Sequence, residues 1–279
     1  MARLFIFILL LLPSVALARP AYLEWFNTVL PNKGGQALII HGLNTKPEKM
    51  SYLIKEINDR GHDVLLVRLK GHNEDLEEMK KVTKDTWLRQ VDEAFTELAK
   101  RGEENKGSVT FFAHSLGAVL GTSYLASHPL VKVDQMVLFA PALKVKFTSK
   151  FIKALFGFPD GFIVPSMTPI NYRAQRGTTI AAYKALFDTI SFFEAADLAV
   201  INVPTTVIMD PEDELVSFPG IQGLVGKQDK WKLLTVSTKG SVLPKPYHHL
   251  IISGEALGFQ EWEDKVLRTM DSVLGKKAL

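Results

Sequence analysis

The chain of 279 residues contains no cysteine, which excludes disulfide bonds, thiolate nucleophiles and metal sites built on cysteine. It also lacks a basic block, because its 33 lysine and arginine side chains are interspersed with 30 acidic ones. Nucleic-acid-binding proteins need a clustered basic face, so the charge pattern argues against that class. The seven histidines show no i, i+4 pair, and glycine-rich phosphate-binding patterns are absent. We therefore predict neither a metal nor a cofactor.

Long apolar runs are missing beyond the first 18 residues, and that first stretch is itself short. Arg3 precedes an uncharged apolar run from Leu4 to Leu12, and Ala16-Leu17-Ala18 supplies small residues for cleavage. This pattern is typical of a secretory signal peptide, cut here before Arg19. The alternative is an uncleaved membrane anchor, which needs about 20 apolar residues. We expect a protein exported to the periplasm or the cell exterior.

Short apolar runs alternate with amphipathic segments from residue 36 onward. The runs predict strands, and the segments between them carry apolar side chains at helical spacing. Repeated strand–helix units build a parallel sheet with helices on both faces, so the predicted fold class is α/β. The sheet is expected to have about six strands, because the stretch after Arg19 is too short for a leading hairpin. The predicted strands are residues 37–40, 64–67, 109–112, 136–139, 205–209 and 233–236.

One interval is much longer than the others. Roughly 60 residues separate the fourth and fifth predicted strands, whereas a crossover needs about a dozen. Phenylalanine is frequent there, and a second stretch places apolar side chains on one helical face: Tyr183, Leu186, Phe187 and Ile190. We predict a helical insertion at about 144–200 within a single domain that spans 19–279. It forms either additional core or an apolar cap over a pocket.

A serine lies where the third predicted strand meets a helix, in Ala113-His114-Ser115-Leu116-Gly117. A sharp turn from strand to helix holds its serine in a strained conformation with the hydroxyl exposed. Small residues two positions away on either side allow the strand and the helix to approach closely. The helix N-terminus favours negative charge that develops nearby. Ser115 is therefore a candidate nucleophile.

With this turn, the sequence resembles the α/β-hydrolase superfamily, especially its capped esterases, monoacylglycerol-lipase-like proteins and serine-aminopeptidase-like proteins. The resemblance covers nearly the whole chain after the expected signal peptide. It rests on four segments in order: His41-Gly42-Leu43-Asn44, Gly71-His72-Asn73, Ala113 to Gly117, and an acid followed by a histidine. Ala113 departs from the pattern, because the family usually has glycine there. The resemblance implies an α/β-hydrolase fold and the chain order serine, acid, histidine.

The resemblance favours Asp213 as the acid. It follows strand 205–209 by a few residues and precedes a hydrophobic pair, as the family's acid normally does. Asp210 is the alternative acid and stands where the family often has glycine. The other reading is that both carboxylates are solvated loop acids, which are common in turns.

The base must come from the loop after the last strand, where only His248 and His249 occur. Family histidines are often followed by two apolar residues, which favours His249, before Leu250 and Ile251. His248, which follows Tyr247, is the alternative base. A histidine pair in the one loop that must supply a base indicates a catalytic role rather than a structural one.

The implied function is an exported serine hydrolase that cleaves carboxylic esters through an acyl-enzyme. Ser115 would be the nucleophile, His249 the base and Asp213 the orienting acid, with the backbone N–H groups of Leu43 and Leu116 as the oxyanion hole. The substrate is expected to be a hydrophobic ester, and the Phe-rich part of the insertion could contact a lipid surface transiently.

The other histidines are given no chemical role. His41, with Gly42, is expected to shape the turn after the first strand, while His72 and His114 match family positions that pack or hydrogen-bond near the site. His62 and His128 are expected at the surface.

Two other functions stay open. A serine peptidase or amidase would use the same three side chains on small peptides, with Glu212 and Glu214 as the acidic pair for a peptide amine. A catalytically inactive hydrolase fold that serves as a binding protein is the second alternative.

Overall fold

The computed structural model describes residues 20–31, 34–73, 75–105, 107–146, 151–245 and 247–277. The expected signal peptide, residues 1–18, lies outside the described residues. Within those ranges, no helix combines the length and the apolar character that a bilayer span requires.

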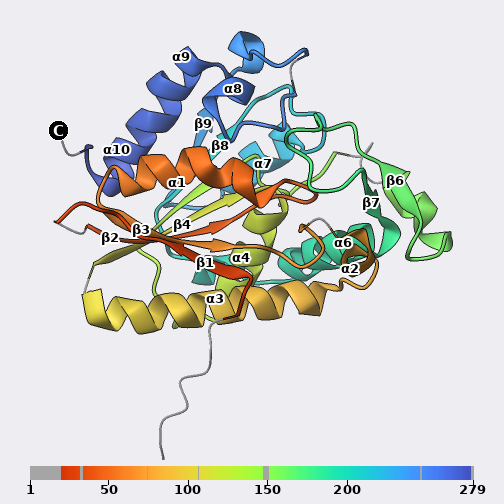
Figure 1. Cartoon of the computed structure of the whole chain (residues 1–279), viewed down its shortest axis with the longest axis horizontal. Helices are drawn as coiled ribbons and strands as arrows, with labels where there is room; N and C mark the ends of the chain where they lie inside the picture. The colour runs from red at the N-terminus through yellow and green to blue at the C-terminus, as the bar shows by residue number, and fades with distance from the viewer. Residues whose placement is uncertain are drawn as a thin grey trace, which may run out of the picture.

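Seven strands form one mostly parallel sheet in the order β1-β3-β2-β4-β5-β8-β9 (Figure 1). Its six parallel members correspond to the six predicted strands, which confirms the α/β class. The strands are β1 (Leu23–Phe26), β2 (Gly35–Ile40), β3 (His62–Val67), β4 (Ser108–His114), β5 (Gln135–Phe139), β8 (Thr205–Met209) and β9 (Trp231–Thr235).

The additional strand is β1, which the sequence analysis did not expect. It has four residues and pairs antiparallel with β3 at the sheet edge, with Leu23 opposite Val67. A leading hairpin is not needed for this arrangement, because one short strand can use the free edge of β3 directly. The sheet therefore has seven strands rather than six.

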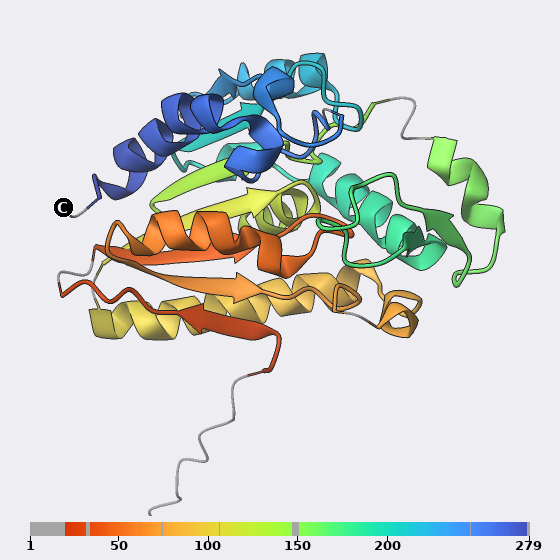
Figure 2. The same cartoon turned by 45° about the horizontal axis from the view of Figure 1, so that its top comes forward.

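Helices cover both faces of the sheet (Figures 1 and 2). On one face lie α1 (Ser51–Asn58), preceded by η1 (Pro47–Met50), and the C-terminal run of α8 (Gly254–Leu257), α9 (Phe259–Glu261), the π-helical η5 (Trp262–Leu267) and α10 (Arg268–Leu274). The other face carries α3 (Lys84–Asn105) and α4 (Leu116–Ser127), and α6 (Ile180–Glu194) packs against these two helices. The remaining short helices are α2 (Leu76–Met79), α7 (Phe218–Val225), η3 (Leu198–Val200) and η4 (Thr238–Gly240).

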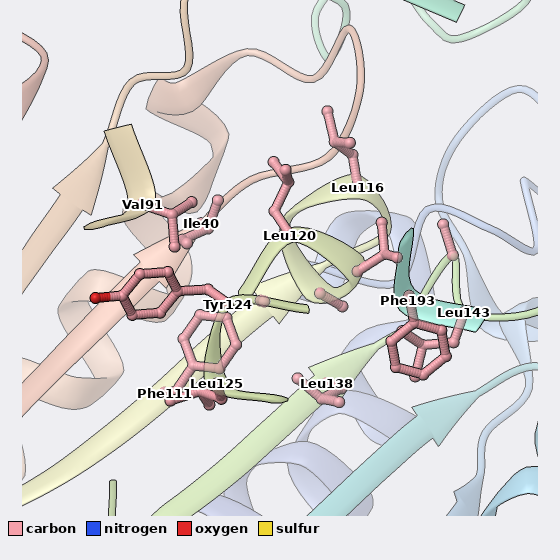
Figure 3. Packing of buried hydrophobic residues seen from close by; sticks show 14 of the residues in the cluster. Ile40, Val91, Phe111, Leu116, Leu120, Tyr124, Leu125, Leu138, Leu143 and Phe193 are labelled. Carbon is pink, nitrogen blue, oxygen red and sulfur yellow. The ribbon is translucent and has the colours of Figure 1, made fainter. Parts of the chain in front are cut away.

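Alternate side chains of the strands enter two separate cores. Leu38 and Ile40 of β2 belong to the cluster with α3, α4 and α6, whereas Ala37 and Ile39 belong to the cluster with α1 and the C-terminal helices. Successive side chains of a strand point to opposite faces, so an uninterrupted apolar run is what a sheet covered on both sides requires. Figure 3 shows part of the first cluster.

The long interval between β5 and β8 lies beyond the carboxyl ends of the parallel strands (Figure 2). It contains η2 (Phe151–Gly157), a hairpin of β6 (Ile163–Pro165) and β7 (Gly177–Thr179), and then α6. Residues 147–150 of the expected insertion lie outside the described part of the chain. α6 packs against α4 and α3, and its Phe193 joins the same buried cluster (Figure 3). This part of the insertion is therefore core.

One histidine expected at the surface is buried. His62 begins β3, and its Nε2–H donates to the carbonyl of Leu274 at 3.0 Å, so it connects the amino end of the strand to the end of α10. The expectation was wrong because strand 64–67 starts two residues earlier than its apolar run suggests. His128 is exposed, as expected.

Candidate active site

Ser115 lies in the turn between β4 and α4 with φ 49° and ψ −110°, a backbone conformation that residues other than glycine rarely adopt. Its N–H donates to the carbonyl of Phe139 at 3.0 Å, which ties the turn to the neighbouring strand β5. A Cβ atom on Gly117 would lie 2.2 Å from the carbonyl oxygen of Ile40, so only glycine permits this approach of helix and strand. Ala113, the departure from the family pattern, has a side chain that packs in the core.

The imidazole of His249 lies between Ser115 and Asp213. Its Nε2 is 2.8 Å from Ser115 Oγ, which is positioned to donate its hydroxyl hydrogen, and its Nδ1–H donates to Asp213 Oδ2, also at 2.8 Å. Asp213 Oδ1 accepts the N–H groups of Leu215 and Val216, each at 2.8 Å. The first choices of the sequence analysis for nucleophile, acid and base are therefore within hydrogen-bond distance of one another.

The pKa values of His249 and Asp213 are shifted in opposite directions. Burial lowers the pKa of His249, but the charge and hydrogen bond of Asp213 outweigh it and raise the pKa above its ordinary value of 6.5. Burial raises the pKa of Asp213, but the charge and hydrogen bond of His249 and two backbone N–H groups lower it below 3.8. Asp213 is thus ionised at neutral pH and favours a positive charge on the imidazole.

The backbone of His249 is held at both ends. Its N–H donates to Glu214 Oε2 at 3.0 Å, and its carbonyl accepts the Nε2–H of His114 at 3.0 Å. Burial in particular lowers the pKa of His114 to about 3, so this ring is neutral and acts as a fixed donor. His114 thus hydrogen-bonds near the site, as the resemblance implied, and Glu214 contacts the base loop.

The alternative acid and base lie elsewhere in the same loops. His248 Nδ1 is 3.2 Å from Asp210 Oδ2, and its Nε2 is 3.6 Å from Glu212 Oε2, so its ring faces these two carboxylates rather than Ser115. Donor atoms of these three side chains lie within 4.8 Å of one another. The two carboxylates face different edges of the imidazole, so they do not converge on one of its nitrogens.

The turn after β2 carries the other predicted backbone donor. Among the described residues, no acceptor takes the N–H of Leu43 or of Leu116. Asn44 has φ 53°, and its N–H donates to His72 Nε2 at 2.9 Å. Burial in particular lowers the pKa of His72 to about 4, which keeps this nitrogen an acceptor. His41 adds a bond from the N–H of Leu69 to its Nε2 at 3.1 Å, so both histidines shape this region.

Sequence reasoning did not identify the contact between this turn and the insertion. Asn44 Oδ1 accepts the N–H of Gln175 at 2.7 Å, and Asn44 Nδ2 donates to the Gln175 carbonyl at 3.2 Å. The carbonyl of Tyr172 accepts the N–H of Lys46 at 2.8 Å. The asparagine occurs in a motif that was noticed, but Gln175 lies in an irregular segment without a distinguishing sequence signal.

Comparisons with known proteins identify the family of the chain. A family model described as "Serine aminopeptidase, S33" matches residues 32–175, just over half of the chain. A thermostable monoacylglycerol lipase from Bacillus sp. (strain H-257) is 31% identical over 116 residues, a match that spans 42% of each chain.

Two solved structures share the fold over most of the chain. A chain from the work on the metagenome-derived lipolytic enzymes LipS and LipT has a TM-score of 0.70 and 20% identity, and the match covers 90% of this chain and 96% of that one. A soluble variant of monoglyceride lipase from Saccharomyces cerevisiae has a TM-score of 0.73 and 10% identity, with 92% of each chain covered. At these identities the structures establish the fold. Together with the family match, they show that the chain belongs to the serine aminopeptidase family and has the α/β-hydrolase fold.

Proposed function

We propose that the protein is a serine hydrolase that cleaves carboxylic esters through an acyl-enzyme. Ser115 attacks the ester carbonyl, His249 accepts the serine proton and then passes it to the leaving alcohol, and Asp213 orients the imidazole. The observation that carries this proposal is the position of His249. Its Nε2 is 2.8 Å from Ser115 Oγ, and its Nδ1 is 2.8 Å from Asp213 Oδ2. Water then attacks the acyl carbonyl while His249 takes its proton, and the bond to Ser115 Oγ breaks as this proton passes to the serine, which releases the acid.

The negative charge that develops on the carbonyl oxygen needs donors held in place beforehand. The N–H groups of Leu43 and Leu116 are the donors we propose, because none of the described residues takes either group. Leu116 is also the first residue of the 12-residue helix α4, whose positive dipole end favours the oxyanion. The bonds that fix Asn44 beside Leu43 support a rigid oxyanion hole.

Two observations favour an ester with a hydrophobic acyl part. Two of the matched proteins are named as a monoacylglycerol lipase and a monoglyceride lipase. The insertion beyond the strand ends also supplies apolar side chains that are only partly buried, such as Ile152, Phe156 and Leu186. Burial of an acyl chain against such a surface contributes about 0.8 kcal/mol per methylene group.

The direct test is hydrolysis of p-nitrophenyl esters of increasing chain length by the wild type and by Ser115→Ala. We expect kcat/KM to rise with chain length in the wild type and to fall by about 10⁴-fold or more in the variant. A fluorophosphonate should label Ser115 of the wild type, as peptide mapping would show. Equal ester hydrolysis by both proteins, or an unlabelled serine in folded protein, would refute the proposal; the latter result would favour a catalytically inactive binding protein.

The family description favours one further candidate, a serine peptidase that acts on small peptides. The same three side chains would serve, but the acidic pair considered for a peptide amine is engaged: Glu214 binds the His249 N–H, and Glu212 faces His248. Parallel assays on monoacylglycerols and aminoacyl arylamides distinguish the two candidates, and we expect the ester to be the better substrate.

We also propose that the protein is exported, on the evidence of the pattern in residues 1–18. Expression of the full chain in a bacterium, followed by mass spectrometry of the protein outside the cytoplasm, should give a mature N-terminus at Arg19. Retention of intact protein in the cytoplasm or the membrane would contradict export by a cleaved signal.

A further inference from the structure

A second pair of histidine and aspartate lies directly beside the first. His248 and Asp210 come from the same two loops as His249 and Asp213, and the distance from His248 Nδ1 to Asp210 Oδ2 is 3.2 Å. Since the ring of His248 faces Asp210 on one edge and Glu212 on the other, it takes no part in the proton transfer proposed above. Its role is therefore sought in the contacts that hold the loop before His249.

Asp210 is a fixed point in this part of the molecule. It is buried, and its Oδ1 accepts the N–H of Glu212 at 2.9 Å, while its Oδ2 accepts the N–H and the hydroxyl of Thr238 at 2.8 and 2.9 Å. Its backbone carbonyl accepts the N–H of Asp213 at 3.1 Å. A buried carboxylate is costly unless its oxygens are hydrogen-bonded, and here both of them are. Asp210 therefore joins the loop of the proposed acid to η4.

Thr238 determines which way the ring of His248 donates. The threonine hydroxyl has one hydrogen, which goes to Asp210 Oδ2. His248 Nδ1 lies 2.7 Å from the same hydroxyl oxygen, so this nitrogen must carry a hydrogen and donate it. The ring is thereby held against two side chains that are both almost fully buried. The backbone of His248 leads directly into His249.

We propose that Asp210, Thr238 and His248 are positioning residues, which hold the loop before His249 so that its imidazole reaches Ser115 and Asp213 together. This inference rests on the proposed function. The base has to meet two partners at 2.8 Å from one loop, and a displacement of about 1 Å costs as much as 100-fold in rate. The network connects the loop after β8 with two parts of the stretch after β9, namely η4 and the segment that contains His249.

The test uses two matched pairs of variants. Thr238→Val removes the hydroxyl at nearly constant volume, and Thr238→Ser keeps it. His248→Leu removes the donor, and His248→Asn keeps an N–H near the position of Nδ1. We expect the Val and Leu variants to lose about 10-fold in kcat on a p-nitrophenyl ester, with KM within about twofold, while the Ser and Asn variants stay near the wild type. The double variant Thr238→Val/His248→Leu should lose little more than either single variant, because both act through one network.

A second measurement does not depend on hydrolysis. Hydrogen exchange of the backbone in residues 247–252, followed by mass spectrometry on the full chain, should accelerate in the Val and Leu variants and not in the Ser and Asn variants. If the wild type cleaves no ester, the proposed function fails, but the exchange rates still test whether Asp210, Thr238 and His248 hold this loop.

Two results would overturn the inference. One is unchanged kcat and unchanged exchange in both the Val and the Leu variant. The other is a His248→Leu variant as inactive as Ser115→Ala beside a normal Thr238→Val, because His248 would then act chemically.

Discussion

At the scale of single residues, the hydrogen bonds of the Asp213 carboxylate determine how the proposed base is held and charged. Both oxygens of its buried carboxylate accept hydrogen bonds, Oδ1 from two backbone N–H groups and Oδ2 from the imidazole of His249. The charge that remains on it is what raises the pKa of His249 against the effect of burial. The pH dependence of the reaction therefore reports on this one contact.

Asp213→Asn should change the pH profile in a direction that can be derived. The base works only when neutral, so in the wild type the rate rises with pH through the raised pKa of His249, and half of the limiting rate is reached above pH 6.5. Without the carboxylate charge the pKa of His249 falls, so the rising part of the pH profile moves to lower pH. In addition, kcat drops by about 10⁴-fold because the imidazole loses its orientation.

The measurement is kcat/KM on a p-nitrophenyl ester between pH 4 and 9. Asp229→Asn, at an exposed turn, is the matched control and should leave the profile unchanged. A rising part of the profile that stays in place or moves to higher pH in Asp213→Asn would contradict the role proposed for Asp213.

The residues proposed to carry the chemistry could be predicted from the sequence better than the residues that hold them in place. Ser115, Asp213 and His249 could be named because a strand–helix turn, a chain order and two loops restrict the choice. Glu214 and Gln175 could not, because each makes its contact with the backbone or side chain of a residue distant in sequence. Neither the residue type nor its spacing in the sequence predicts such a hydrogen bond.

At the scale of elements, the insertion divides into two parts. α6 continues the core over α4, whereas η2 packs against that cluster only with partly buried side chains, and the segment between β6 and β7 places Tyr172 in the other cluster. The sequence predicted the helical face of 183–190 but left open whether it was core or cap, since both need apolar side chains. β1 was missed for a related reason: four residues at a sheet edge provide too little periodicity to recognise.

Phe193→Ala should test the role of α6. Phe193 is almost fully buried in the cluster with α4, so its loss should lower the free energy of unfolding by about 3–5 kcal/mol. Urea denaturation is the measurement. Phe192→Ala is the matched control, because Phe192 is only half-buried, and its loss should cost less than half as much. An unchanged unfolding free energy in Phe193→Ala would indicate a helix that is not part of the core.

At the scale of the whole molecule, one segment of the insertion exposes large apolar side chains close together in sequence. They are Phe158, Phe162, Met167 and Ile170, and the last two are 76% and 69% exposed. Exposed apolar clusters of this kind are typical of interaction sites. A lipid surface is the partner that fits an enzyme proposed to cleave hydrophobic esters.

We therefore expect Met167→Ser/Ile170→Ser to reduce co-sedimentation with phosphatidylglycerol–phosphatidylcholine vesicles by several-fold, since two apolar side chains no longer enter the interface. Hydrolysis of a soluble short-chain ester should be unchanged. Val29→Ser/Leu130→Ser is the control, because these residues are 95% and 93% exposed but lie outside the insertion. Equal loss of vesicle binding in both double variants, or in neither, would argue against a lipid-facing insertion.

The incorporation of α6 into the core has a practical consequence for exchanging segments between relatives. A graft that replaced the entire interval between β5 and β8 would remove Phe193 and its neighbours from the packing over α4, and would endanger folding before it altered selectivity. A graft confined to η2 and the β6–β7 hairpin leaves that packing intact, provided that Tyr172 keeps its place in the other core and Gln175 keeps its bonds to Asn44. Recombination within these narrower limits is thus the route by which this scaffold can acquire new substrate preferences.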